Sequence, residues 1–237
     1  MEEVIRFDQQ LLLMLNGSDS VWLDQVMLHI TKTATWIPLI AALLILLLKN
    51  RPWREVVLFV LSLALVILVC DQFASTLCKP LFHRFRPSHE PALQGLVDLV
   101  NDRRGGPYGF ISSHAANTFG AFTFIALYLR RIAPCRLILP SKVTILMWAC
   151  FSSYSRIYLG LHYPGDILAG AAAGLLFGTL IYFLMSFFAA HWQARRPTLI
   201  TFPFVNGSSA NNAFSSPFDA FLLPATFLLT IGVICLF

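Results

Sequence analysis

The segment from Ser155 to Asp166 brings an Arg, a His and an Asp together between two apolar stretches. A neutral imidazole is a better nucleophile or base when a carboxylate accepts its second N–H, because this contact fixes the tautomer and stabilises the imidazolium that forms. His162 and Asp166 could be such a pair. Pro164 and Gly165 argue against a regular helix between them, so we expect the contact in a turn, with Asp166 as N-cap of the following apolar stretch. The alternative is a polar loop with a capping Asp, and this segment alone favours neither.

A second polar segment, Lys79 to Pro87, carries Lys79 and Arg86 seven residues apart at the end of an apolar stretch. The Arg is a planar fork and the Lys a point charge, so together they could hold an oxyanion. Basic residues at the ends of membrane spans also commonly anchor to lipid headgroups. This segment therefore predicts an anion site only in combination with others.

A third polar segment, Gly109 to His114, precedes another apolar stretch. Ser112 is well placed as the N-cap of a helix, whose first N–H groups and positive dipole end would face an anion. His114, in the first turn, would lie against the same anion. A single interfacial His is usually only a solvated polar residue, so this segment too depends on its neighbours.

The composition places these segments in a membrane protein. Of the 237 residues, 57% are hydrophobic and 12% are charged, and the mean hydropathy is +0.70. Such a chain is too apolar to be soluble and is predicted to be one integral membrane domain over residues 1–237. The formal charge of +5 then reflects basic loops and contact with anionic lipid, and nucleic acid is excluded as a partner. The five cysteines stand singly, without metal-ligand spacing, and are predicted to be packed side chains.

The apolar stretches predict an all-α integral membrane bundle of about six transmembrane helices with an N-terminal interfacial helix. The interfacial helix, Ile5–Leu15, is too short and too polar to span. No basic region precedes it, so no cleaved signal peptide is predicted. Residues 195–218 are predicted to form a loop. The six predicted spans are Trp36–Leu48, Val56–Leu77, Ser112–Leu129, Leu137–Ser153, Ile167–Phe188 and Ala220–Phe237.

The basic residues predict which ends of the spans face the cytoplasm. The turns after the first, third and fifth spans hold nine of the seventeen Lys and Arg residues. Of the other eight, Lys79, Arg86 and Arg156 are candidates for the anion site, which leaves five. By the positive-inside rule the nine face the cytoplasm, so the three polar segments and both termini face outward.

Together, the three polar segments resemble the three-part signature of the type 2 phosphatidic acid phosphatase superfamily, membrane lipid phosphatases related in site design to vanadium haloperoxidases. The chain has Lys-x6-Arg-Pro from Lys79, then Ser-Ser-His at 112–114, then Ser-Arg-x5-His-x3-Asp from Ser155. All the charged positions match. The middle segment departs, because the family usually has Pro-Ser-Gly-His where this chain has Ile-Ser-Ser-His. The resemblance covers residues 79–166.

The resemblance implies hydrolysis of a lipid phosphate through a phosphohistidine. His162, oriented by Asp166, would attack phosphorus, His114 would protonate the leaving oxygen, and water would release phosphate. No cofactor and no metal are implied, because three fixed cations compensate the phosphate charge and the chain has no carboxylate cluster for a hard cation. The implied substrate-binding residues are Lys79, Arg86, Ser112, Ser113 and Arg156.

Ser113 adds a side chain where glycine would let a phosphate approach most closely. We expect only its backbone N–H to serve the phosphate while the hydroxyl turns toward solvent.

The expected partners are a phosphorylated membrane lipid and the bilayer. An outward site points to an envelope lipid, lipid A or undecaprenyl pyrophosphate in a bacterial source, with the protein in the inner membrane and its site facing the periplasm. The run from Arg86 to Pro91 and the loop to Gly106 resemble the lipid A phosphatase branch. His89 and Glu90 could contact a sugar headgroup or could be ordinary loop residues.

Two rival functions use the same residues differently. A non-enzymatic transporter or anionic-lipid binding protein would use the basic residues without turnover, and a transporter would favour inverted repeats with broken helices, which the sequence lacks. A haloperoxidase-like oxidation at bound vanadate is disfavoured because such enzymes are soluble.

Overall fold

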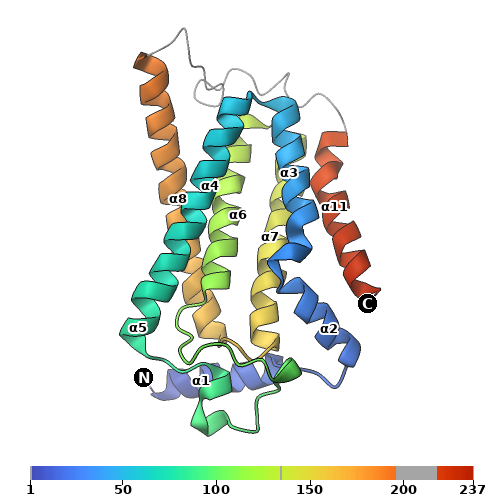
Figure 1. Cartoon of the computed structure of the whole chain (residues 1–237), viewed down its shortest axis with the longest axis vertical. Coiled ribbons are helices and arrows are strands. Elements are labelled where there is room, and N and C mark those ends of the chain that lie inside the picture. The colour runs from blue at the N-terminus through green and yellow to red at the C-terminus, as the bar shows by residue number, and fades with distance from the viewer. Residues whose placement is uncertain (1, 134, 196–217, 237) are drawn as a thin grey trace.

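The computed structural model describes residues 2–133, 135–195 and 218–236, which form a bundle of long helices (Figure 1). In these ranges there is no sheet, only an isolated bridge between Phe85 and Tyr108. The predicted all-α architecture is confirmed. The α-helices are α1 Glu2–Leu15, α2 Val21–Ile30, α3 Ile37–Asn50, α4 Trp53–Gln72, α5 Lys79–Phe82, α6 Ser113–Ile132, α7 Cys135–Tyr158, α8 Pro164–Arg195 and α11 Phe218–Cys235. A π-helical turn, Phe73–Cys78, joins α4 to α5, and 3₁₀ turns lie at Thr33–Trp36, Pro87–His89, Pro91–Leu93 and Val100–Asp102.

Five helical segments of the described ranges are long and apolar enough to cross a membrane by length and composition. The predicted count of about six spans is therefore approximate. The exception is α6, the third predicted span, which packs against α4, α7 and α8. Its surface meets protein more than lipid, so it does not need the apolarity of a lipid-facing helix. The five segments are Thr33–Asn50, Trp53–Phe82, Leu137–Tyr158, Pro164–Arg195 and Phe218–Cys235.

Three glycines of α8, Gly170, Gly174 and Gly178, face α6 at intervals of four residues. A Cβ atom at Gly174 would collide with the carbonyl oxygen of Ala116, and the other two meet α6 backbone in the same way. Small residues at this spacing let two helix backbones touch. The contact sets the first turns of α6 and α8 side by side, where the Ser112 N–H donates to the Asp166 carbonyl at 3.1 Å.

The two ends of the bundle differ in what they carry. The α3–α4 turn and the C-terminal ends of α6 and α8 lie at one end, and the loops before α6 and α8 lie at the other (Figure 1). The three polar segments therefore share one end, as predicted. The helix α1 lies across that end, which agrees with the predicted interfacial helix, while α2 was not predicted.

Several boundaries correct the predictions. α7 continues to Tyr158, so Arg156 lies in its last turn and not in a loop. The second span continues through the π-helical turn into α5, which ends at Phe82. α8 begins at Pro164, before the predicted start of the fifth span. Residues 196–217 of the predicted loop, and Phe237 at the end of the sixth span, lie outside the described residues.

A buried ion pair lies at the α3–α4 turn. Arg51 donates from Nε to Oε1 and from Nη2 to Oε2 of Glu55, both at 2.9 Å, and the two side chains are 2% and 0% exposed. The Tyr128 hydroxyl of α6 also donates to Glu55 Oε1. This bidentate geometry neutralises both charges within the protein.

Candidate active site

His162 lies in the short connection between α7 and α8 and is 2% exposed. The connection folds back onto α7, since the N–H groups of Leu161 and His162 both donate to the Arg156 carbonyl, at 3.0 and 3.3 Å. Gly160 has φ +66°, a left-handed conformation that favours glycine at the end of a helix. The backbone of α7 thus fixes where the imidazole lies.

α8 begins at Pro164, so Asp166 lies in its first turn, and the prediction that Asp166 is the N-cap is wrong. His162 lies before the helix, which agrees with the expectation that no regular helix joins the two residues. Proline is well tolerated at the first helical position, because its missing N–H would have no intrahelical partner. Asp166 Oδ2 accepts from the Tyr163 N–H at 3.1 Å and lies 3.5 Å from Nδ1 of His162. The predicted His–Asp pair is brought together at a distance that is long for a hydrogen bond.

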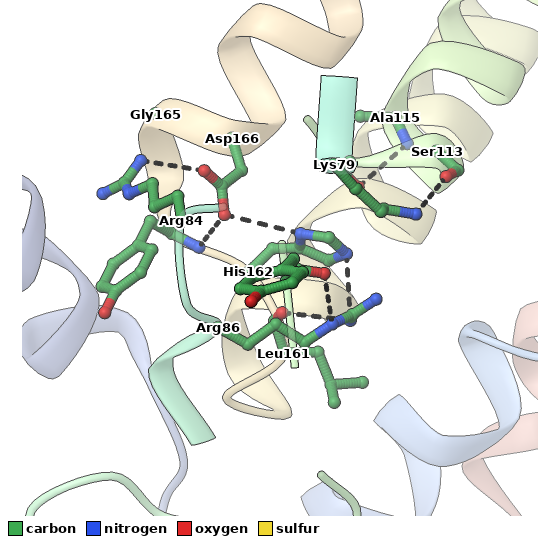
Figure 2. A network of polar contacts seen from close by, with 12 residues as sticks. Lys79, Arg84, Arg86, Ser113, Ala115, Leu161, His162, Gly165 and Asp166 are labelled. Carbon is green, nitrogen blue, oxygen red and sulfur yellow. Dashed lines mark hydrogen bonds and ion pairs between the residues drawn. The ribbon is translucent and has the colours of Figure 1, made fainter. Parts of the chain in front are cut away.

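Arg86 approaches the other nitrogen of the His162 ring (Figure 2). Its Nη1 lies 3.3 Å from His162 Nε2 and donates to the Leu161 carbonyl at 3.2 Å, while its Nε donates to the Tyr108 carbonyl at 3.2 Å. A guanidinium can only donate, so we infer that Nε2 is unprotonated and that Nδ1 carries the proton toward Asp166. The Nε2 lone pair is then directed at the basic side of the site.

Three cations act on His162. Burial lowers the pKa of the imidazole well below 6.5, and Arg86, Arg156 and Lys79 lower it further. His162 is therefore neutral at pH 7, which is the form that can attack an electrophile.

Arg156 has a donor without a partner. Its Nη1 donates to the Thr31 hydroxyl at 2.8 Å, but its Nε is buried and has no hydrogen-bond partner in the described residues. A buried unsatisfied donor costs about 1–3 kcal/mol. An anion bound within hydrogen-bond distance of this Nε would satisfy it.

Lys79 and Ser113 are in direct contact (Figure 2). The Lys79 ammonium donates to Ser113 Oγ at 2.9 Å and to Ser75 Oγ at 3.1 Å. The expectation that the Ser113 hydroxyl turns toward solvent is wrong, because an ammonium has three donors and this one finds hydroxyl acceptors on both sides. The side chain that replaces glycine thus helps to hold a cation of the site.

Ser112 and His114 begin α6 as predicted. Ser112 is fully buried and caps the helix, its hydroxyl accepting from the Ala115 N–H at 3.4 Å. His114 hydrogen-bonds the backbone of Thr31 and lies close enough to Arg156 and His162 to interact electrostatically with both. Thr31, the residue after α2, therefore contacts two residues of the site, although no sequence pattern predicted it.

Two further residues were missed. Arg84 Nη1 donates to Asp166 Oδ1 at 2.8 Å, and its Nη2 donates to Asp8 Oδ2 at 2.6 Å. The signal for Arg84 was available, since it is a third basic residue in the segment from Lys79 to Pro87. No sequence signal marked Asp8, because nothing distinguishes it from other carboxylates of an interfacial helix.

Two cavities lie at this end. One of about 390 Å³ is lined by residues that include Lys79, Arg86, His83 and Tyr108. The other, of about 280 Å³, is lined in part by His89, Glu90 and Arg104. The Ser88 hydroxyl donates to the Arg104 carbonyl at 2.8 Å and so joins the two loop runs that resemble the lipid A branch.

The described residues hold no group of three His, Cys, Asp or Glu side chains that could bind a metal ion.

Comparison with known proteins covers most of the chain. The PAP2 superfamily model matches residues 55–190. A protein named lipid A 4′-phosphatase from Bacteroides thetaiotaomicron is 42% identical over 192 residues, which are 80% of this chain and 82% of that protein. A protein of the same name from Porphyromonas gingivalis is 35% identical over 194 residues, 81% of this chain and 78% of its own. The crystal structure of a transmembrane PAP2-type phosphatidylglycerolphosphate phosphatase from Bacillus subtilis has a similar fold, with a TM-score of 0.55 at 21% identity over 81% of this chain and 88% of that one.

Proposed function

The chain belongs to the PAP2 superfamily of membrane phosphatases, and from this premise we propose that it removes a phosphate monoester from lipid A through a phosphohistidine at His162. The substrate is proposed from the two relatives named lipid A 4′-phosphatase, each matched over about four fifths of this chain. The observation that carries the proposal is the buried site itself, where three cations surround a neutral His162 and a donor of Arg156 has no partner within the described ranges.

In the proposed reaction, Lys79, Arg86 and Arg156 bind the phosphate and compensate the charge on its equatorial oxygens. The Nε2 lone pair of His162 attacks phosphorus, and the bond from phosphorus to the lipid oxygen breaks with its electrons going to that oxygen. The proton on Nδ1 stays in place, and Asp166 stabilises the positive ring.

His114 supplies the proton that the leaving oxygen needs. A bound phosphate dianion offsets the surrounding cations and so favours the protonated imidazole that this step requires. Water then attacks the phosphohistidine, His114 takes a proton from that water, the bond from nitrogen to phosphorus breaks, and phosphate leaves. The enzyme returns to its starting state without a metal or cofactor.

We propose that the site faces the periplasm. The helix ends with the basic turns lie at the opposite end of the bundle from the site (Figure 1), and the positive-inside rule assigns basic turns to the cytoplasm. A lipid in the outer leaflet of the inner membrane would then reach the site.

The test is release of inorganic phosphate by the purified protein in detergent with EDTA. We expect release from bis-phosphorylated lipid A with a higher kcat/KM than from undecaprenyl pyrophosphate, and accumulation of the phosphorylated lipid in cells that lack the protein. Binding of lipid A without release would favour the non-enzymatic alternative. Loss of activity in EDTA would contradict only the proposal that the reaction needs no metal ion.

Vanadate offers a second test of the phosphohistidine route. Its trigonal-bipyramidal form resembles the transferring phosphoryl group, so we expect competitive inhibition with tighter binding than phosphate. Insensitivity to vanadate at about 1 mM, the upper end of ordinary KM values, would argue against this route.

A further inference from the structure

The N-terminal helix α1 contributes a buried carboxylate to the catalytic end of the bundle. Most residues of α1 are exposed, and the helix lies across that end (Figure 1). Asp8 is an exception, with 9% of its surface exposed. A buried carboxylate is costly unless it is paired and hydrogen-bonded. The partners of Asp8 therefore indicate its role.

Both oxygens of Asp8 have partners. Oδ2 accepts from Arg84 Nη2 at 2.6 Å, and Oδ1 accepts from the Gly165 N–H at 2.8 Å. Arg84 in turn donates from Nη1 to Asp166 Oδ1 at 2.8 Å, and its guanidinium lies over the Tyr163 ring, 4.1 Å from the centroid. Figure 2 shows the inner part of this chain of contacts, from Arg84 through Asp166 to His162.

The start of α8 accommodates Asp8. A Cβ atom at Gly165 would lie 2.7 Å from Asp8 Oδ2, closer than such atoms can approach. Glycine at this position therefore lets the Asp8 carboxylate reach the first turn of α8, at the residue directly before Asp166.

The charges of this chain of contacts determine what His162 experiences. Arg84 alone beside Asp166 would cancel most of the negative charge that the imidazole needs for its stabilisation. Because Arg84 is shared between two carboxylates, the three groups keep one net negative charge against the cations. The charged and titratable groups that face His162 are Asp166 from α8, Arg86 from the loop after α5, Lys79 from α5, Arg156 from α7 and His114 from α6.

We propose that Asp8 is a positioning residue for the nucleophile, which acts through Arg84 to aim the Asp166 carboxylate at His162 Nδ1 and to keep its charge available. Asp8 lies outside residues 55–190, the segment that matches the family. α1 thus completes a site whose reacting groups all lie inside that segment. The inference rests on the proposed phosphatase function.

Asp8→Asn and Arg84→Gln should shift the pH dependence in opposite directions. Losing Asp8 makes the surroundings of His162 more positive and the ring harder to protonate, so the acid limb of kcat/KM moves to lower pH. Losing Arg84 makes the surroundings of His162 more negative and the ring easier to protonate, so the acid limb of kcat/KM moves to higher pH. We expect kcat to fall about 10- to 100-fold in each variant, as for other residues that orient a reacting group, with KM little changed because neither residue touches substrate.

The assay is phosphate release from lipid A, measured across a range of pH. The lipid ionises in the same way with every variant, so differences between the pH profiles report on the protein. Asp8→Glu keeps the charge and should recover most of the activity. Glu2→Gln removes a carboxylate from the same helix at an exposed position and should behave as wild type. Wild-type kinetics in Asp8→Asn, or limbs that move in the same direction in both variants, would overturn the proposal in favour of a merely structural contact.

A substrate-independent measurement separates this inference from the proposed function. NMR of protein labelled at histidine, with His162 assigned by His162→Gln, reports the pH at which that ring protonates. If the wild type releases no phosphate, the proposed function fails, while opposite shifts of the His162 titration in Asp8→Asn and Arg84→Gln would still support the role of Asp8. Unchanged or parallel shifts would overturn it.

Discussion

The two ends of the bundle differ in how their buried arginines are paired. At the α3–α4 turn, Arg51 and Glu55 form a bidentate pair, and Tyr128 adds a further hydrogen bond to the carboxylate. At the other end, Arg86 and Arg156 lie beside a histidine, and a donor of Arg156 has no partner among the described residues. The Arg51–Glu55 pair is neutral by itself, whereas the cations beside His162 leave a donor that an anion could accept from.

This difference supports the proposal that the end with His162 is the catalytic one. A buried pair whose partners satisfy each other has no capacity left for a ligand, however short its contacts are. A buried cluster with surplus positive charge is costly in the empty protein and becomes favourable when a phosphate binds. Substitutions at the two ends should therefore separate stability from turnover.

His162→Ala should have the largest effect at the catalytic end. Loss of the nucleophile should lower kcat by at least about 10³-fold, because the remaining groups bind and polarise the phosphate but cannot form the covalent intermediate. Phosphate release from lipid A measures it, with His191→Ala, an exposed histidine of α8, as the matched control. More than a small fraction of wild-type activity would remove His162 from its proposed role.

Glu55→Gln should show the converse. It leaves the buried Arg51 charge without its carboxylate, and breaking such a pair costs about 3–5 kcal/mol of stability. Thermal unfolding in detergent should shift to a clearly lower temperature, while kcat measured well below the transition stays as in wild type. A fall in kcat that matches the loss of stability in Glu55→Gln would contradict the distinction between the two ends.

Arg156→Lys should lower kcat/KM by about 10²–10³-fold, as for loss of a transition-state donor. Lysine keeps the charge but lacks the planar fork and the Nε–H, which has no partner in the part of the chain that the structure describes. Vanadate inhibition should weaken along with turnover. Equal loss of vanadate affinity in Arg51→Lys would mean that the two ends are not independent.

The smallest effect is expected at Ser113. Ser113→Gly and Ser113→Ala both remove the hydroxyl that accepts from Lys79, while Ser75 still holds the ammonium. Loss of one of two neutral acceptors corresponds to about 1 kcal/mol, or roughly a fivefold fall in kcat/KM. Unchanged kinetics in both variants would mean that the hydroxyl contact with Lys79 contributes nothing to turnover.

The grouping of the proposed reacting residues at one end could be predicted from sequence because their motifs are local. His162 and Asp166 are four residues apart, Ser112 caps the helix that carries His114, and each motif stands at the edge of an apolar stretch. The long apolar stretches likewise predicted the helices of the bundle. The error at Pro164 came from treating proline as a helix breaker where the first helical position tolerates it.

The contacts of the supporting residues could not be predicted because they join distant segments, although Arg84 itself stands out as a basic residue of the Lys79–Pro87 segment. Arg84 meets Asp166 across 82 residues and Asp8 across 76, and Arg156 meets Thr31 across 125. The contacts of Asp8 and Thr31 exist only once α1 and α2 are placed against the bundle. No periodicity or motif within either helix encodes that placement.

The glycine contact between α6 and α8 also bears on how the site responds to its membrane. Helices adjust to a bilayer that is too thick or too thin by tilting. Neighbours that touch through side chains can follow such a tilt with small rotamer changes, but α6 and α8 touch through backbone at Gly174 and have no such freedom. The backbone contact therefore fixes the separation of Ser112 from Asp166. We expect a change in bilayer thickness to alter how the lipid reaches the site but not the distances within it.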